Sequence, residues 1–235
     1  MKRIVPLALS LALAGLLCAR APSVVADPPR PLPPVDEVAA LEGGTPLPDT
    51  AATYTFPWMP KQSVIAISDA EAERMVASVD FSDPGLANFG TVSLDGKGGG
   101  TGSFKVASTD LKTVSSQRDE HLQGEMWLDA KKFPDVVFTI TKLERLKPTV
   151  YRASGTWKMH GVEKPISVLA NVRLIPKIEH FGENIARLKA RLSLNLKDFG
   201  VANPYVGSNA VAEAWTVDLV VLGVPGEPKA APGGK

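Results

Sequence analysis

The feature that most constrains the fold is an alternation of apolar and polar side chains with a period of two. It is clearest in residues 166–175, where apolar side chains occupy every even position from Ile166 to Leu174. Successive side chains of an extended strand point to opposite faces, so this spacing predicts strands with one apolar face. The same pattern occurs in residues 136–141, 151–160, 190–197 and 216–221.

Shorter apolar runs predict further strands, and turn-forming residues lie between them. These strands are expected at Ser63–Ile67, Gly90–Asp95 and Gly102–Ala107. Turns rich in glycine or proline are expected at residues 96–100 and 161–165. Helix is scarce, with short helices predicted at residues 69–79, behind Ser68 as N-cap, and at Ser116–Gly124, and a single turn at residues 129–133.

These patterns predict an all-β fold of about eight antiparallel strands with one or two short helices. Strands that share one apolar face must close on each other as a barrel or a sandwich, and a barrel leaves no unpaired edge. A barrel of this size either fills with its own side chains or holds one small ligand. The residues expected to point inward are Val168, Ala170, Val172, Leu192, Leu194, Leu219 and Val221. Those expected to face water are Arg173, Arg191, Lys197 and Asp218.

The N-terminus has the pattern of a secretory signal peptide. Basic residues precede an apolar run that ends at Leu17 and is too short to span a bilayer comfortably. Small residues before Asp27 predict cleavage after Ala26, which implies a periplasmic or secreted protein without cysteine or disulfides. The alternatives are an uncleaved anchor and lipoprotein anchoring at Cys18, although Leu17 is larger than the residue that usually precedes a lipidated cysteine.

The two ends of the chain differ in composition from its middle. Residues 27–50 contain seven prolines, so residues 27–51 are expected to form a disordered linker. Residues 225–235 are expected to form a disordered tail, which leaves a single domain over residues 52–224. Lysine and arginine total 26 against 25 acidic residues, and this balance gives no broad basic field for nucleic acid.

The densest polar cluster is Arg118-Asp119-Glu120-His121-Leu122. On a helix Arg118 and His121 share a face, as a catalytic base and its partner could. No nucleophile motif accompanies them, and none of the three histidines lies at a metal-ligand spacing from another. We therefore favour a polar cap at one barrel end over an enzyme, with no catalytic residue, cofactor or metal. Arg118 is expected to be held by Asp119 or a backbone carbonyl.

Four motifs, in this order, make the chain similar to the YceI-like family. They are RDEHL at Arg118–Leu122, DAKKFPDVVF at Asp129–Phe138, GTWKMHGVEKPI at Gly155–Ile166 and KDFGV at Lys197–Val201. The resemblance runs from Tyr54 to Val224. It implies a lipocalin-like antiparallel β-barrel whose interior binds polyisoprenoid or other amphiphilic lipids, usually in a periplasm.

The chain also departs from the pattern of that family. Residues 77–85 match poorly where the family has G-x-F-x-x-x-x-G, and Met159 and Glu163 stand where a hydroxyl residue is usual. A divergent member with another ligand or a filled barrel is therefore a second reading, as a structural or interaction domain on its Pro-rich tether.

The favoured interpretation is an exported protein that carries or sequesters an isoprenoid-type or other amphiphilic lipid. Transient contact with a membrane surface is expected, and the oligomeric state, including a dimer, is left open. Large or adaptable apolar side chains would line the interior. Two polar ones would meet a phosphate or quinone oxygen at the mouth. The expected contacts are Phe104, Arg118, His121, Trp127, Phe138, Trp157, Met159, Val168, Val172, Leu192, Leu194 and Leu219.

Overall fold

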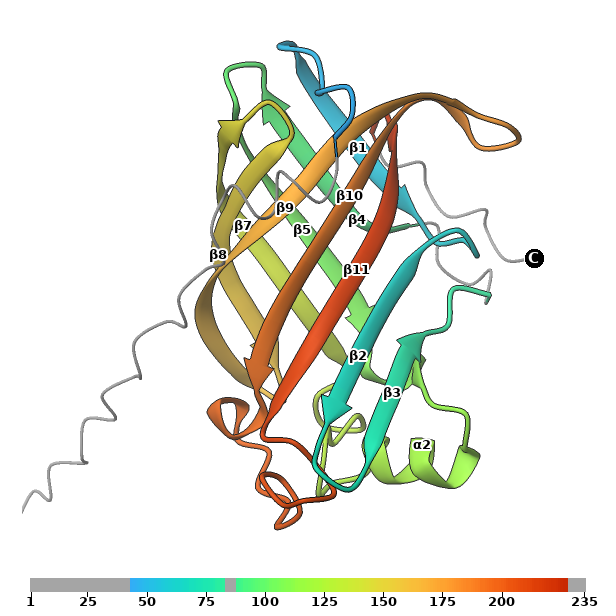
Figure 1. Cartoon of the computed structure of the whole chain (residues 1–235), viewed down its shortest axis with the longest axis vertical. Coiled ribbons are helices and arrows are strands. Elements are labelled where there is room, and N and C mark those ends of the chain that lie inside the picture. The colour runs from blue at the N-terminus through green and yellow to red at the C-terminus, as the bar shows by residue number, and fades with distance from the viewer. Residues whose placement is uncertain (1–42, 83–87, 228–235) are drawn as a thin grey trace, which may run out of the picture.

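The computed structural model describes residues 43–82 and 88–227, which form antiparallel strands joined mainly by turns (Figure 1). The strands are β1 (Ala51–Pro57), β2 (Ser63–Asp69), β3 (Arg74–Val79), β4 (Asn88–Asp95), β5 (Gly99–Ala107), β6 (Leu111–Lys112), β7 (Asp135–Lys147), β8 (Val150–Met159), β9 (Val162–Ile178), β10 (Gly182–Asn195) and β11 (Ala214–Pro225). The helices of these residues are α2 (Ser116–Gln123) and the 3-10 turns η1 (Ser108–Asp110) and η2 (Leu196–Phe199).

Eight of the strands close into a barrel. Their order is β1-β4-β5-β7-β8-β9-β10-β11, and β11 pairs back with β1 at Tyr54–Pro225 and Thr55–Val224. The predicted all-β antiparallel barrel is therefore confirmed, and its closure decides against a sandwich. The remaining strands β2, β3 and β6 continue the sheet from the other half of β11 (Figure 1). We call the end that carries α2 the lower end and the opposite one the upper end.

One glutamine side chain bridges the place where β11 changes partner from β1 to β2. The Gln62 amide oxygen accepts from the Leu222 N–H at 2.7 Å, and its Nε2 donates to the carbonyls of Leu222 and Pro57, both at 3.0 Å. Gln62 is only 7% exposed. Its side chain thus supplies bonds that the backbone of a partner strand would otherwise supply.

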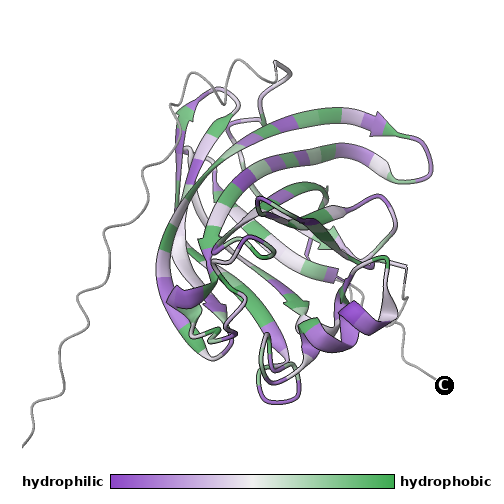
Figure 2. Ribbon diagram, turned by 60° about the horizontal axis from the view of Figure 1, so that its bottom comes forward, coloured by the Kyte–Doolittle hydropathy of each residue, from purple (hydrophilic) through white to green (hydrophobic). Residues whose placement is uncertain are grey.

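The period-two pattern places its apolar face inside the barrel, and Figure 2 shows the resulting alternation of hydrophobic and hydrophilic residues along the strands. Among the residues expected to point inward, Val172 and Leu219 pack against the core while partly buried. The others are fully buried, namely Val168, Ala170, Leu192, Leu194 and Val221. The burial of this face of β9, β10 and β11 confirms the expected sidedness.

Among the residues expected to face water, Arg191 and Lys197 are exposed, whereas Asp218 and Arg173 are half-buried. Arg191 donates to Asp218 at 2.6 Å on the outer surface, and Lys197 pairs with Glu213 at 3.0 Å. Arg173 was expected to be wet but is half-buried, because the segment before β1 lies against it. One of its nitrogens donates to the carbonyl of Gly43 at 3.3 Å.

Two sequence-based expectations of local structure are wrong. Residues 69–79 form a turn and β3 rather than a helix, because Met75, Ala77 and Val79 alternate inward and pair with β2. The expected turn over residues 161–165 is only His160-Gly161, whose φ angles of 51° and 75° suit a two-residue hairpin. Strand β9 begins directly after it. The helix at α2 and the turn at residues 129–133 are confirmed.

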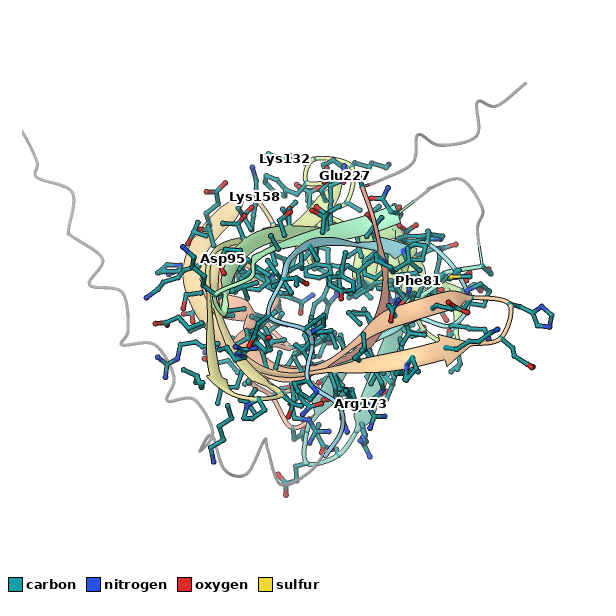
Figure 3. All side chains as sticks on the ribbon, turned by 90° about the horizontal axis from the view of Figure 1, so that it is seen from above. Phe81, Asp95, Lys132, Lys158, Arg173 and Glu227 are labelled. Atoms are coloured by element: carbon teal, nitrogen blue, oxygen red, sulfur yellow. The ribbon has the colours of Figure 1, made fainter. Side chains whose placement is uncertain are left out.

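Residues 43–50, which the sequence assigns to the linker, lie across the upper end of the barrel (Figure 3). We call them the strap. The Leu174 N–H donates to the Thr45 carbonyl at 2.7 Å, and Asp49 forms an ion pair with Arg145. Leu47 is 4% exposed and belongs to the hydrophobic core. One leucine of the strap thus closes the interior from above.

The predicted signal peptide, its cleavage site, Cys18 and most of the proline-rich stretch lie outside the described residues, as does the end of the tail. Within those residues, no helix combines the length and the apolar character needed to cross a membrane.

Candidate ligand-binding site in the barrel lumen

The upper part of the lumen contains a cavity of about 100 Å³. Inward side chains of most of the barrel strands line it, and they are almost entirely aliphatic or aromatic. Lys105 also borders the cavity, but its ammonium group pairs with Asp135 and its side chain is 59% exposed. The predicted contacts found in this lining are Phe104, Phe138, Trp157, Val168, Leu192 and Leu219.

A second cavity of about 80 Å³ occupies the lower part of the lumen. Leu122 of α2 and Leu128 of the following turn form part of its wall, so the segment after β6 closes the barrel from below. The predicted contacts found in this lining are Trp127, Trp157, Met159 and Leu194.

The two cavities lie end to end and share one layer of side chains. This layer consists of Val64, Val106, Val136, Trp157 and Val217, each of which lines both cavities. Trp157 is the largest of them and packs against Phe138 with ring centroids 5.7 Å apart. The layer therefore divides a lumen that would otherwise be one apolar channel.

A cluster of aromatic rings fills the wall of the upper cavity near β1 and β4. Phe56 meets Phe104 edge-on at 4.8 Å, and Phe89 lies 5.0 Å from Phe81. Gly90 makes room for this packing, because a Cβ there would lie 2.3 Å from the Phe104 ring. The cluster narrows the cavity on this side by filling it with protein atoms.

Three of the family motifs meet at the lower end. The Phe133 ring lies edge-on to the His160 ring at 4.8 Å, and His160 Nδ1 lies 3.0 Å from the carbonyl of Phe199. Gly161 has a φ of 75°, and a Cβ there would lie 2.4 Å from Phe133. These motif residues hold turns together instead of lining the lumen, and they make the lower end a packed base.

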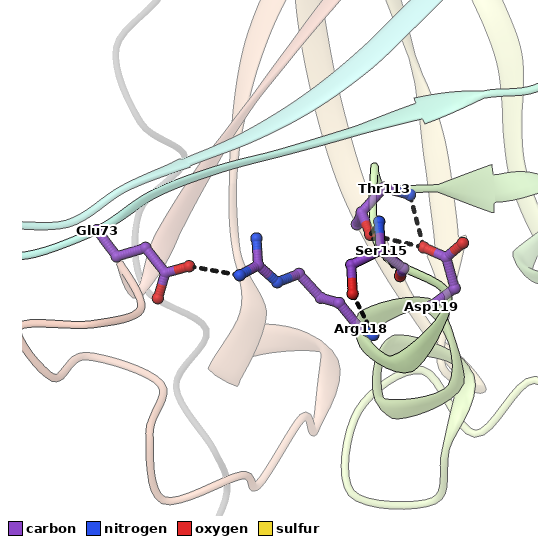
Figure 4. A network of polar contacts seen from close by, with 5 residues as sticks. All are labelled: Glu73, Thr113, Ser115, Arg118 and Asp119. Carbon is purple, nitrogen blue, oxygen red and sulfur yellow. Dashed lines mark hydrogen bonds and ion pairs between the residues drawn. The ribbon is translucent and has the colours of Figure 1, made fainter.

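The polar cluster at α2 is a surface network (Figure 4). Arg118 was expected to be held by Asp119 or a backbone carbonyl, but its guanidinium pairs with Glu73 of the β2–β3 turn at 2.9 Å. Asp119 instead accepts from the N–H and the hydroxyl of Thr113 at 2.6 and 2.8 Å. The reason is geometric, because Ser115 caps the helix and turns Asp119 back toward the preceding chain.

Not every predicted contact reaches the lumen. Arg118 and His121 line neither cavity, and His121 is exposed on α2. Val172 packs against the core above the upper cavity without lining it. The residue of the RDEHL motif that does reach the lumen is Leu122, which is 4% exposed.

The upper end carries polar residues that the sequence pattern missed. Tyr54 and Tyr151 are each 4% exposed, and burial raises the pKa of both phenols. Arg145 interacts with Tyr151 and with Asp49 of the strap, and its hydrogen bond lowers the pKa of that carboxyl. Tyr151 does occupy an inward position of the alternation, whereas an irregularity in β7 between Ile140 and Lys142 hides the orientation of Arg145.

Nothing in the described part of the chain groups three or more histidine, cysteine, aspartate or glutamate side chains as a metal site would require. The side chains that line the two cavities are almost entirely apolar.

A closed antiparallel barrel with an apolar lumen and a packed base is a lipocalin-like fold. The YceI-like domain matches residues 63–222, and the chain belongs to the YceI-like family. The resemblance predicted from the four motifs is therefore confirmed.

Known relatives agree with this assignment. The chain is 34% identical to a UPF0312 protein of Pseudomonas putida strain F1 over 122 residues, which are 50% of this chain and 61% of that protein. It is 32% identical to a UPF0312 protein of Pseudomonas fluorescens strain SBW25 over 127 residues, 52% of this chain and 64% of that protein. The matched region thus spans less than two thirds of these relatives.

Among solved structures, BcnA of Burkholderia cenocepacia has a similar fold, with a TM-score of 0.57 and 16% sequence identity. The match covers 69% of this chain and 96% of BcnA. At this identity the likeness concerns the fold alone.

Proposed function

We propose that this protein binds an isoprenoid-type or other amphiphilic lipid in the barrel lumen and acts as a carrier or scavenger rather than as an enzyme. The observation that carries the proposal is the pair of apolar cavities lying end to end within the barrel. Each buried CH₂ of a lipid chain gains roughly 0.8 kcal/mol relative to water. Membranes offer the same gain, so the shape of the lumen and its polar groups must supply selectivity.

The free space in the lumen is small. Cavities of about 100 and 80 Å³ are each smaller than the roughly 150 Å³ that accommodates one benzene ring. A long chain therefore enters only if the shared layer around Trp157 moves aside. Entry from the upper end is favoured, because the strap closes that end with one buried leucine, whereas the lower end is a packed base.

The second candidate function is a filled barrel that serves as a structural or interaction domain. The small cavity volumes favour it, and so does the aromatic cluster that fills the wall beside β1 and β4. In that case the residual cavities are packing defects, as closely packed interiors retain a few.

Native mass spectrometry of the protein purified gently from its own host tests the two candidates. A co-purifying lipid of several hundred daltons supports the carrier. A clean mass of the polypeptide alone, together with failure to take up added long-chain lipids, supports the filled barrel and contradicts the carrier.

The proposal includes export, with cleavage after Ala26, because the lipid would be met at a membrane surface outside the cytoplasm. N-terminal sequencing of the mature protein should then begin at Asp27. A start at an acylated Cys18 would replace a free carrier by one anchored in the membrane.

A further inference from the structure

The indole of Trp157 carries a buried hydrogen-bond donor that has no partner among the described residues. We propose that Trp157 Nε1 binds an oxygen acceptor of the lumen ligand, such as a carbonyl, ether or hydroxyl oxygen. The ligand would then be an amphiphile with its acceptor halfway along the barrel, rather than a pure hydrocarbon or a lipid with all its polar atoms outside. This inference rests on the proposed function and specifies its ligand.

The location of Trp157 makes it suited to this role. It lies on the inward face of β8, pairs across the sheet with Lys164, and lines both cavities. A chain that extends through both cavities must pass this side chain. The side chain that carries the donor is therefore at a level of the lumen that every long ligand would pass.

Water is a poor partner for this donor. A buried water molecule is held by several polar groups at once, and genuinely apolar cavities stay dry. Besides Trp157, Lys105 is the one lining residue of the upper cavity with a polar side-chain group, and its ammonium group pairs with Asp135. An unmet N–H in such surroundings costs free energy, and a ligand oxygen that meets it recovers that cost.

Two other tryptophans show what distinguishes Trp157. Trp215 lines the lower cavity, but its indole donates to the Ala212 carbonyl at 3.1 Å. The Trp58 indole is also without a partner, yet Trp58 lines neither cavity and packs 4.7 Å from Phe81. Of these three, Trp157 alone lines the cavities and also has an indole donor without a partner among the described residues. Trp58 provides a matched control.

The test compares Trp157→Phe and Trp58→Phe using two probes of equal carbon number, a long-chain methyl ketone and an n-alkane. Phenylalanine keeps an aromatic ring but removes the donor, and any change of cavity shape affects both probes alike. We expect the ratio of ketone to alkane affinity to fall about 5- to 10-fold in Trp157→Phe, as loss of one hydrogen bond predicts. Trp58→Phe should leave the ratio of the unmodified protein unchanged.

The outcomes separate this inference from the proposed function. If neither probe binds the unmodified protein, lipid binding in the lumen is contradicted. If both bind but the ratio is the same in Trp157→Phe and the unmodified protein, the role of Trp157 is overturned while lumen binding stands.

A spectroscopic measurement covers the case in which Trp157→Phe does not fold. In the ¹H–¹⁵N spectrum of the unmodified protein, addition of the ketone should move one indole signal downfield, and the alkane should not. Identical responses to both probes would overturn the inference without any variant.

Discussion

At the scale of single residues, the densest polar cluster of the sequence does not supply the strongest polar interactions of the barrel. Gln62 makes three hydrogen bonds at the seam of the barrel, two of them to Leu222. Arg118, in the densest polar cluster of the sequence, makes one ion pair in which both side chains are more than 40% exposed. Because Gln62 is buried and Arg118 is not, the hydrogen bonds of Gln62 should contribute more to the free energy of unfolding than the ion pair of Arg118.

Replacing Gln62 by leucine should lower the free energy of unfolding by about 2–4 kcal/mol, because the buried N–H and C=O of Leu222 lose their partner. Urea unfolding measures this. Gln117→Leu on the exposed face of α2 is the control and should change little. Equal effects of the two substitutions would contradict the role of Gln62.

Arg118→Ala should lower the free energy of unfolding by less than about 1 kcal/mol, the usual range for an exposed ion pair. Leu122→Ala on the same helix removes a buried side chain and should cost about 2–5 kcal/mol. Thermal or urea unfolding of the two variants compares them directly. A loss in Arg118→Ala as large as in Leu122→Ala would show that the arginine is a structural anchor after all.

At the scale of elements, the two ends of the barrel are closed in different ways. The lower end is covered by α2, the turn after it and the segment from η2, and it buries many apolar side chains. These include Leu122, Leu128, Leu196, Phe199 and Val201. The upper end is crossed by the strap with Leu47, so opening it disturbs far less buried surface.

Leu47→Ala should speed ligand exchange if the lipid enters from the upper end as proposed. Loss of about 2 kcal/mol of packing free energy would raise the population of the conformation with an open strap more than tenfold. Stopped-flow uptake and release of a fluorescent long-chain fatty acid measures the rates. Val114→Ala, at a fully exposed position outside the barrel, is the control. Unchanged rates in Leu47→Ala would place the entry elsewhere.

At the scale of the whole molecule, carboxylates on the outer surface favour the folded state at neutral pH. A hydrogen bond from Arg191 lowers the pKa of Asp218 below its usual 3.8. Hydrogen bonds from Asn195 and Lys197 lower the pKa of Glu213 below its usual 4.5, and backbone N–H groups lower that of Asp95. Because these folded-state pKa values are lower than those of the unfolded chain, their stabilisation is present above the unfolded values and is lost as pH falls.

Protonation of these carboxylates should therefore change the free energy of unfolding little between pH 7 and pH 5 and should lower it below about pH 4. Urea midpoints measured across this range test the expectation. Asp218→Asn should show a shallower acid decline than the unmodified protein, because it lacks one of the contributing carboxyls. Identical declines would mean that the ion pair with Arg191 contributes nothing measurable.

The sequence by itself determined the class of fold and the sidedness of its longest strands. The alternation in β8, β9, β10 and β11 holds over most of their length, because one face lies in the core, and a slip by one residue would turn that face outward. Residues 168–171 of β9 depart from it, since four consecutive residues are buried there. Spacing of motifs also identified the family. The helix predicted over residues 69–79 failed, because pairing of β3 with β2 outweighed a capping signal that acts only locally.

Only the tertiary structure decided which inward residues meet in a cavity. Phe104 and Phe138 lie far apart in sequence from Leu219, yet closure of the barrel brings them to one lining. Arg145 turns inward at an irregularity of β7 that no local pattern announces. The Trp157 donor has no partner among the described residues, and the side chains that line the cavities with it are almost all apolar. Alternation specifies the direction of a side chain, whereas its neighbours depend on register and closure, which involve pairing between distant segments.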